Sequence, residues 1–314
     1  MIGELLKKVG ILPGRKAQGT ATARVLRGLM SRFTVRGLVR VDREAFRERI
    51  QAFLDTTDHE GEGFRDPFKQ RDLSVRFHWG HNHDFGDFSL KGLMGNRHIK
   101  QLSRFIDEFQ AIPPELGGKC VLEVGSWTGG MSLLLSAMGA HVTAIEEVKK
   151  YSECLAYLKF AFDIPNLDPR NMSLYECTTP EFQDRFDFVF LTGVLYHVSD
   201  PLLALRIAFN ALKDGGLCLI ETAAFPSPER VLSYEGPTVF GPGRREDLSR
   251  TGWNWFIPSP ESLRQMLTDV GYRDIRLGPI RDNRAYGAER LYATAKRVSH
   301  IDMLRSGLSV RKIR

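Results

Sequence analysis

Cysteines are few in this sequence, and long hydrophobic runs are missing. Four cysteines occur in 314 residues, and none has the C-x-x-C spacing of a zinc or redox motif. This scarcity favours reduced thiols over a disulfide framework. No apolar run reaches the ~18 residues that span a bilayer, and the N-terminus lacks the apolar core and cleavage site of a signal peptide. We therefore expect a protein of the cytoplasm.

Charge is distributed unevenly along the chain. The net charge is +6, but residues 1–40 carry +8 and residues 296–314 carry +5, so residues 41–295 sum to −7. By composition the body is therefore not a nucleic-acid-binding surface, whereas the two ends fit the phosphates of RNA or of an anionic membrane. Solvated arms without a partner are the alternative.

Strand and helix patterns alternate from about residue 119 onwards, after a predicted helix at 42–54. Such alternation is typical of an α/β fold with a parallel sheet covered by helices. The last two strands are separated only by a short turn-rich segment, so we expect an antiparallel hairpin. Ser259, Pro260 and Glu261 predict the start of the helix before it. The predicted strands are 119–124, 141–145, 172–176, 187–191, 217–222, 272–277 and 290–295.

The segment VLEVGSWTGG, residues 121–130, indicates a turn between a buried strand and a helix. Gly125 and Gly130 fit the G-x-G-x-x-G pattern of dinucleotide-binding folds, but Trp127 stands where a glycine must let the backbone approach a pyrophosphate. Glu123 repels phosphates and attracts ammonium and sulfonium groups. The loop therefore predicts S-adenosylmethionine, which has no phosphates, rather than NAD. A tight turn without a ligand is the alternative.

Polar residues end the next two predicted strands. Glu146 ends the second strand 21 residues after Gly125, at the position where a carboxylate binds a ribose diol. The third strand is expected to end near Glu176, which places Glu176, Cys177 or Thr178 beside the adenine ring.

The fourth predicted strand ends in Thr192 and Gly193, where the backbone can approach the methionine end of the cofactor. Tyr196 and His197 follow at the carboxyl edge, where open α/β sheets bind ligands. A sulfonium is an activated leaving group, so the protein mainly aligns an acceptor and excludes water. His197 is the candidate base and Tyr196 the candidate orienting group. The alternative is that His197 caps the following helix or packs under it.

Together these segments resemble the class I S-adenosylmethionine-dependent methyltransferases over residues 118–296. The resemblance rests on the order E-x-G-x-x-x-G, an acid at the second strand end, the sequence LYHVSDP after the fourth strand, and the final hairpin. It implies a Rossmann-like, seven-stranded, mostly parallel sheet with an antiparallel C-terminal hairpin. The expected cofactor-binding residues are Glu123, Gly125, Ser126, Gly129, Glu146, Cys177, Thr178, Thr192 and Gly193.

Within this class, the segments GVLYHVSDPLLAL and RFHWGHNHDFGDFSLKG are similar to the bacterial tRNA wobble-uridine carboxymethyltransferase-like group. This resemblance implies a basic N-terminal helical extension and lid at 1–117, a methyltransferase domain at 118–296 and a basic tail at 297–314. It also places an anion-binding arginine at Arg290, which is a third candidate substrate residue.

Three histidines of the segment FHWGHNHD raise the question of a metal site. His78, His81 and His83 have no nearby cysteine and no H-E-x-x-H arrangement, so we expect no metal. In the similar group this segment is the lid, which makes His78 and His81 candidate substrate contacts. An exposed loop histidine is the alternative.

The sequence thus predicts methyl transfer from S-adenosylmethionine to an oxygen or nitrogen of an unidentified acceptor, a small molecule or RNA. Carboxymethyl transfer to tRNA is the alternative, and an NAD-dependent reductase or a silent binding protein are further ones. The resemblance implies a tyrosine, an arginine and a lysine around the extra carboxylate of a carboxymethyl donor. Tyr196 and Arg290 match, but Phe85 stands at the place of the lysine, and Lys91 lies six residues later. We therefore expect the ordinary donor.

Overall fold

The computed structural model describes residues 21–56, 77–235, 255–281 and 289–299. The first twenty residues of the basic N-terminal segment and most of the C-terminal tail lie outside these ranges. The described chain divides after Ser173 into two compact units, and each is described by itself. The domain boundaries predicted from the sequence stay predictions.

Seven strands form the main sheet, in the order β10-β11-β7-β6-β3-β4-β5. Most of them are parallel, and the C-terminal strands are antiparallel, so the predicted α/β, Rossmann-like fold class is confirmed. The strands are β3 (Cys120–Val124), β4 (His141–Glu146), β5 (Leu167–Asn171), β6 (Phe186–Thr192), β7 (Leu212–Ala224), β10 (Arg273–Leu277) and β11 (Glu289–Lys296).

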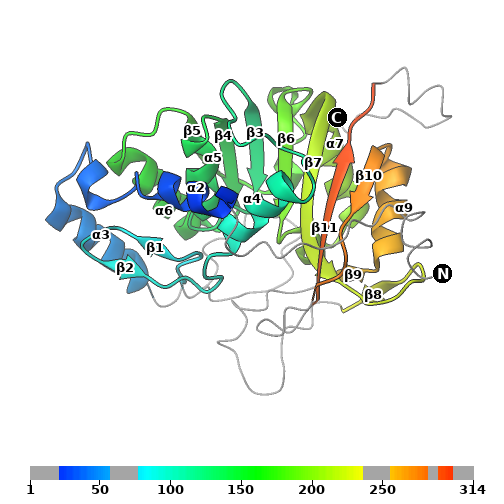
Figure 1. The fold of residues 1–314 in the computed structure, drawn as a ribbon, viewed down its shortest axis with the longest axis horizontal. Helices are drawn as coiled ribbons and strands as arrows, with labels where there is room; N and C mark the ends of the chain where they lie inside the picture. The colour runs from blue at the N-terminus through cyan, green and yellow to red at the C-terminus, as the bar shows by residue number, and fades with distance from the viewer. Residues whose placement is uncertain (1–20, 57–76, 236–254, 282–288, 300–314) are drawn as a thin grey trace. The chain divides into compact units, whose positions relative to one another are not determined.

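Helices pack on β4 and β5 in the first unit, where β3, β4 and β5 run parallel (Figure 1). The predicted helix at 42–54 is confirmed, because Asp42 accepts a hydrogen bond from the Ala45 N–H and caps it. Phe46 on this helix is fully buried and contacts the ring of Phe85 edge to face. The elements are α2 (Ala21–Met30), η1 (Val35–Gly37), α3 (Arg43–Leu54), β1 (His83–Asp84), β2 (Ser89–Leu90), α4 (Arg97–Asp107), α5 (Gly130–Ala137) and α6 (Lys149–Ala161).

The third strand of the sheet lies earlier in the sequence than predicted. We expected it at 172–176, but β5 covers Leu167–Asn171, and residues 174–176 form the short helix η2 instead. The segment LDPRN has no alternating apolar pattern and contains Pro169, which cannot donate a ladder hydrogen bond. A proline is tolerated here because β5 is the last strand of the order and pairs with β4 alone.

Strands β6 and β7 run parallel in the second unit, and β11 pairs antiparallel with β7. The predicted hairpin is confirmed, since β10 pairs antiparallel with β11, and α9 packs beside β10 (Figure 1). The other elements are η2 (Leu174–Glu176), η3 (Pro180–Phe182), η4 (Leu195–His197), α7 (Pro201–Ala211), β8 (Leu232–Tyr234), β9 (Phe256–Pro258) and α9 (Pro260–Val270).

Ser259 caps α9, as predicted, and also holds the start of the β8–β9 ribbon. Its hydroxyl accepts hydrogen bonds from the N–H groups of Ser262 (3.3 Å) and Val231 (3.1 Å) and donates one to the carbonyl of Glu229 (2.5 Å). A two-stranded ribbon is marginal by itself. The buried serine therefore fixes β8 to the helix that follows β9.

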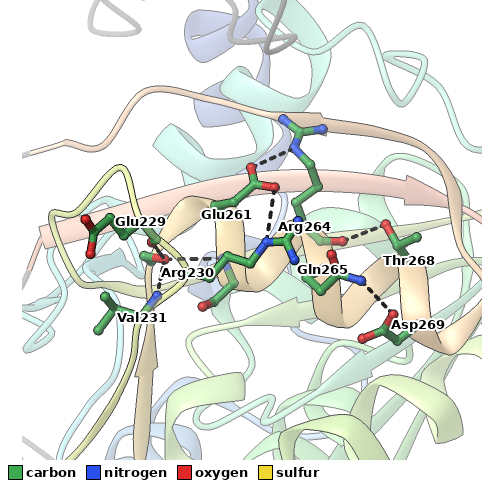
Figure 2. Close-up of polar contacts among 10 residues, drawn as sticks. Glu229, Arg230, Val231, Glu261, Arg264, Gln265, Thr268 and Asp269 are labelled. Atoms are coloured by element: carbon green, nitrogen blue, oxygen red, sulfur yellow. Dashed lines mark hydrogen bonds and ion pairs between the residues drawn. The ribbon is translucent and has the colours of Figure 1, made fainter.

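Glu261, the predicted acid in the first turn of α9, lies between two arginines (Figure 2). Its carboxylate is 3.9 Å from Arg230 Nε and 3.6 Å from Arg264 Nε. Arg230 precedes β8, so this partly exposed network is a second link between the ribbon and α9. A carboxylate in the first turn also complements the helix dipole.

Candidate functional site

Two glycines shape the loop after β3. Gly125 and Gly129 have φ angles of 71° and 83°, a region that favours glycine. The Gly125 N–H donates to the Ile145 carbonyl (2.9 Å), which fixes the loop to β4. A Cβ atom on Gly129 would lie 2.2 Å from Leu155 Cδ1 on α6. The sequence pattern is therefore required both by the turn and by close packing.

Glu146 ends β4 with its carboxylate turned onto this loop. Oε2 accepts a hydrogen bond from the Trp127 N–H (2.8 Å), and Oε1 accepts one from the Val148 N–H (2.9 Å). The Asn171 side chain donates to the carbonyls of Glu146 and Glu147 and holds the strand end. A carboxylate oxygen can accept more than one hydrogen bond, so the fixed group keeps capacity for the hydroxyls of a diol.

Glu123 is a second buried carboxylate in this unit. Its Oε2 accepts a hydrogen bond from the Ser132 hydroxyl on α5 (2.5 Å). Burial raises the pKa of Glu123 to about 8; the Ser132 hydrogen bond opposes this shift, and the nearby charge of Glu146 contributes to it. Burial also raises the pKa of Glu146, although backbone N–H groups oppose the shift.

No cationic side chain among the described residues forms an ion pair with either carboxylate. The hydroxyl of Ser126, in the same loop, is buried and has no hydrogen-bond partner in the described part of the chain. Two buried acids without a cation and an unpaired hydroxyl fit a ligand that carries positive charge and hydrogen-bonding groups. S-adenosylmethionine meets both requirements.

Trp127 takes an unusual conformation in the loop, with a φ of 51°. Its ring lies edge-on to Tyr151, at a centroid distance of 5.9 Å, and edge-on to His81, at 6.4 Å. The N–H of Gly80 donates to the Thr128 hydroxyl (3.0 Å) beside it. The predicted lid segment therefore contacts the loop at Trp127 and Thr128. The sequence suggests that the indole blocks phosphates. It does not suggest that the backbone N–H of Trp127 holds the Glu146 carboxylate.

The structure brings His81 to the loop, whereas the backbone of His78 contacts Tyr151. A Cβ atom on Gly130 would lie 2.7 Å from His81 Nδ1, and the His81 ring is 4.5 Å from that of His98. Burial, with a contribution from Arg97, lowers the pKa of His81 to about 3, so its ring is neutral at pH 7. The His78 N–H instead donates to Tyr151 Oη (3.3 Å). His98, which no sequence pattern singles out, is fully buried.

Across the described ranges, no group of three or more His, Cys, Asp or Glu side chains could hold a metal ion.

Tyr196 and His197 lie on η4, directly after β6 in the second unit. Their ring centroids are 4.0 Å apart. Gly193, at the end of β6, has a φ of 81° and donates its N–H to the Glu221 carbonyl (2.8 Å). Asp200, not His197, occupies the N-cap position of α7. Whether His197 acts as a base or packs under the helix therefore stays a prediction.

Arg290 lies on β11 and contacts Tyr196 in this unit. Its Nη2 donates a hydrogen bond to Tyr196 Oη (2.9 Å), and its Cζ lies 4.7 Å from the centroid of the tyrosine ring. Its Nε is 3.2 Å from Oε1 of Glu221, a fully buried residue of β7 that the sequence did not suggest. Two predicted residues thus meet, and an unpredicted carboxylate pairs with the arginine.

Cys177 and Thr178 follow η2 and not a strand. Cys177 is buried, and the Thr178 carbonyl accepts a hydrogen bond from Gln183 Nε2 (3.0 Å). The strand that was expected to present them ends at Asn171. Their assignment to the adenine ring remains a prediction, without the strand end on which it was based.

The family model and two curated relatives that match this chain are all methyltransferases or carboxymethyltransferases. The family model described as "Methyltransferase domain" matches residues 95–277, more than half of the chain. A tRNA U34 carboxymethyltransferase of Desulfotalea psychrophila is 28% identical over 165 residues, which cover 52% of this chain and 48% of the relative. That of Methylococcus capsulatus is 33% identical over 170 residues, which cover 53% and 48%. This chain thus matches about half the length of these curated relatives.

Among solved structures, the N-terminal domain of EvdMO1, crystallised in the presence of SAH and D-fucose, has a TM-score of 0.55 to this chain. The match covers 82% of this chain and 97% of that one at 16% identity, which shows a shared fold. With the match to the family model, the conclusion is that this chain belongs to the methyltransferase domain family.

Proposed function

We propose that this chain is an S-adenosylmethionine-dependent methyltransferase that acts on an oxygen or nitrogen nucleophile. The observation that carries the proposal is the pair of buried carboxylates, Glu123 on β3 and Glu146 on β4, which lie beside a glycine-shaped loop and have no cationic partner in the described residues. When bound, S-adenosylmethionine supplies a methyl group on a positively charged sulfur, which is already activated for transfer.

The chain's own residues would hold the cofactor. Glu146 accepts hydrogen bonds from the ribose hydroxyls, because two N–H groups already fix its orientation. Glu123 stabilises the positive charge of the cofactor. The Ser126 hydroxyl, which has no hydrogen-bond partner among the described residues, forms a hydrogen bond with the cofactor. We propose that the backbone of Gly125 and Gly129 also contacts the cofactor, beside these groups. The remaining proposed contacts are Cys177 and Thr178 for adenine and Thr192 and Gly193 for the methionine end.

The acceptor is proposed to meet Tyr196 and His197. His197 accepts the proton of an acceptor with a high pKa, and Tyr196 orients the acceptor or the cofactor. His78 and His81 are proposed substrate contacts on the lid. A neutral His81 suits this role, since it can accept a hydrogen bond at pH 7.

Carboxymethyl transfer to tRNA is the second candidate, because the curated relatives are tRNA U34 carboxymethyltransferases. A donor with an extra carboxylate needs cationic partners in a closed site. Phe85, at the place of the lysine, is fully buried and stacks on His83, and Lys91 is exposed. Arg290 already pairs with Glu221. An NAD-dependent reductase finds no support in the family match.

We expect the protein to bind S-adenosylmethionine more tightly than its carboxylated analogue. The test is a side-by-side calorimetric titration of both compounds against the wild type and against the double variant Arg290→Gln/Glu221→Gln, which removes the ion pair without leaving one charge buried alone. Tighter binding of the carboxylated compound to the wild type, lost in the double variant, would restore carboxymethyl transfer as the leading function.

Partners and location remain proposals as well. We propose a small molecule or RNA as the substrate, a cytoplasmic location, and phosphates of RNA or an anionic membrane as partners of the basic ends. Within the described residues, α2 buries Ala23, Leu26 and Met30, while Arg24 and Arg27 are exposed. The apolar face of α2 is thus used in packing, and its arginines remain accessible.

In the part of the chain that the structure describes, no helix has the length and apolar character needed to cross a membrane.

A further inference from the structure

Arg290 is a buried guanidinium with unused hydrogen-bonding capacity. The residue is 7% exposed. Its Nε pairs with Glu221 (3.2 Å), and its Nη2 donates to Tyr196 Oη (2.9 Å). Its Nη1 is buried and has no hydrogen-bond partner in the described ranges. A buried donor on a charged group is costly when unpaired, so this nitrogen points to a ligand acceptor.

The Tyr196 hydroxyl is a second donor in the same contact. An arginine can only donate, so Tyr196 Oη accepts from it, and the phenolic hydrogen must point elsewhere. No acceptor for that hydrogen is found among the described residues. A Cβ atom on Gly193 would lie 3.8 Å from Tyr196 Oη and would meet no other atom within 4 Å outside its immediate neighbours. Space for a ligand atom therefore exists beside the hydroxyl.

Glu221 sets the charge of this contact. It is fully buried, and its carboxylate balances the positive charge of Arg290. Its carbonyl also accepts the Gly193 N–H, which links it to the turn before Tyr196. A carboxylate or phosphate entering a balanced, buried pair adds a negative charge without a partner, which is unfavourable. A carbonyl or hydroxyl oxygen accepts hydrogen bonds and adds no charge.

We propose that Glu221 is a positioning residue whose charge neutralises that of Arg290, so that Arg290 and Tyr196 together donate hydrogen bonds to an uncharged oxygen of the methyl acceptor. The acceptor is then a molecule with a carbonyl or hydroxyl group near the methylated atom, not a carboxylate at that point. The identification of the bound molecule as the methyl acceptor rests on the proposed function. The pair of donors and its preference for a neutral oxygen do not.

The test compares acetamide and acetate, two small probes of nearly equal shape and different charge. Each is titrated into the full chain labelled with ¹³Cζ-tyrosine, and Tyr196→Phe identifies the Tyr196 signal. We expect acetamide to shift this signal in the wild type and acetate to bind at least about tenfold more weakly. In Glu221→Gln, acetate affinity should rise by about tenfold or more, because the positive charge of Arg290 then has no carboxylate beside it. Glu221→Asp, which keeps the charge, should retain the wild-type preference.

Matched variants make each outcome decisive. Asp187→Asn removes a partly exposed carboxylate that pairs with Lys213 and should change neither probe's binding. Glu221→Gln/Arg290→Gln restores neutrality if Glu221→Gln does not fold, and it should lose the response to both probes. An unchanged acetate-to-acetamide ratio in a folded Glu221→Gln, or full responses in the double variant, would overturn the proposal. Cofactor binding is titrated separately, so its failure would instead count against the proposed function.

Discussion

Replacing Glu123 by Gln is expected to stabilise the ligand-free protein, with a gain that grows between pH 5 and pH 8. Burial raises the pKa of this carboxyl from 4.5 to about 8, so the folded state binds its proton more tightly than the unfolded chain does. The contribution of the group to stability is therefore complete below pH 4.5 and is lost as the pH rises through about 8. At the upper end the loss is on the order of 5 kcal/mol. A neutral glutamine avoids this loss of stability, and its amide oxygen can still accept the Ser132 hydrogen bond.

Chemical unfolding of both proteins at pH 5, 6, 7 and 8 measures this effect. The difference in the free energy of unfolding should widen steadily with pH. Glu153→Gln is the control, because this α6 carboxylate is partly exposed beside Lys149 and Lys150. A stability difference for Glu123→Gln that stays constant across the range would show that the carboxyl is not desolvated as described. The same substitution should weaken S-adenosylmethionine binding, since the ligand's positive charge loses its partner.

Glu146→Ala should weaken the binding of both S-adenosylmethionine and its demethylated product by about 1–3 kcal/mol. The ribose, which the two ligands share, loses a charged acceptor, and the N–H groups of Trp127 and Val148 lose the group that fixes the loop. Isothermal titration calorimetry with both ligands measures the loss.

Glu147→Ala is the matched control, because it removes the adjacent carboxylate and leaves the backbone N–H contacts of Glu146 in place. A larger loss of affinity in Glu147→Ala than in Glu146→Ala would show that the ribose carboxylate was assigned to the wrong residue. A loss for S-adenosylmethionine alone would indicate that Glu146 acts on the sulfonium and not on the ribose.

Local sequence signals predicted the elements that are stabilised locally. The cap of α3 by Asp42 and that of α9 by Ser259 depend on neighbours within three residues, so the sequence displays them directly. Strand β5 was misplaced because its segment, with Pro169, lacks an apolar pattern. It is a strand through its pairing with β4, which is not a property of the segment alone.

The candidate site was predictable where a motif carries it and not where distant residues meet. The glycines around residue 125 and the acid at Glu146 follow from spacing. The pair of Glu221 and Arg290 joins residues of two strands far apart in the sequence, and Glu221 sits in an apolar run that indicates only a buried strand. His98 likewise resembles any polar residue of a surface helix until its burial beside His81 is seen.

Calorimetric titration of the wild-type chain with S-adenosylmethionine and, separately, with NADH tests the central claim most directly. The buried carboxylates and the indole of Trp127, which stands where a dinucleotide fold needs a glycine, favour a cationic ligand without phosphates. The account predicts saturable binding of S-adenosylmethionine and no heat of binding with NADH. Saturable binding of NADH together with no response to S-adenosylmethionine or its demethylated product would contradict it.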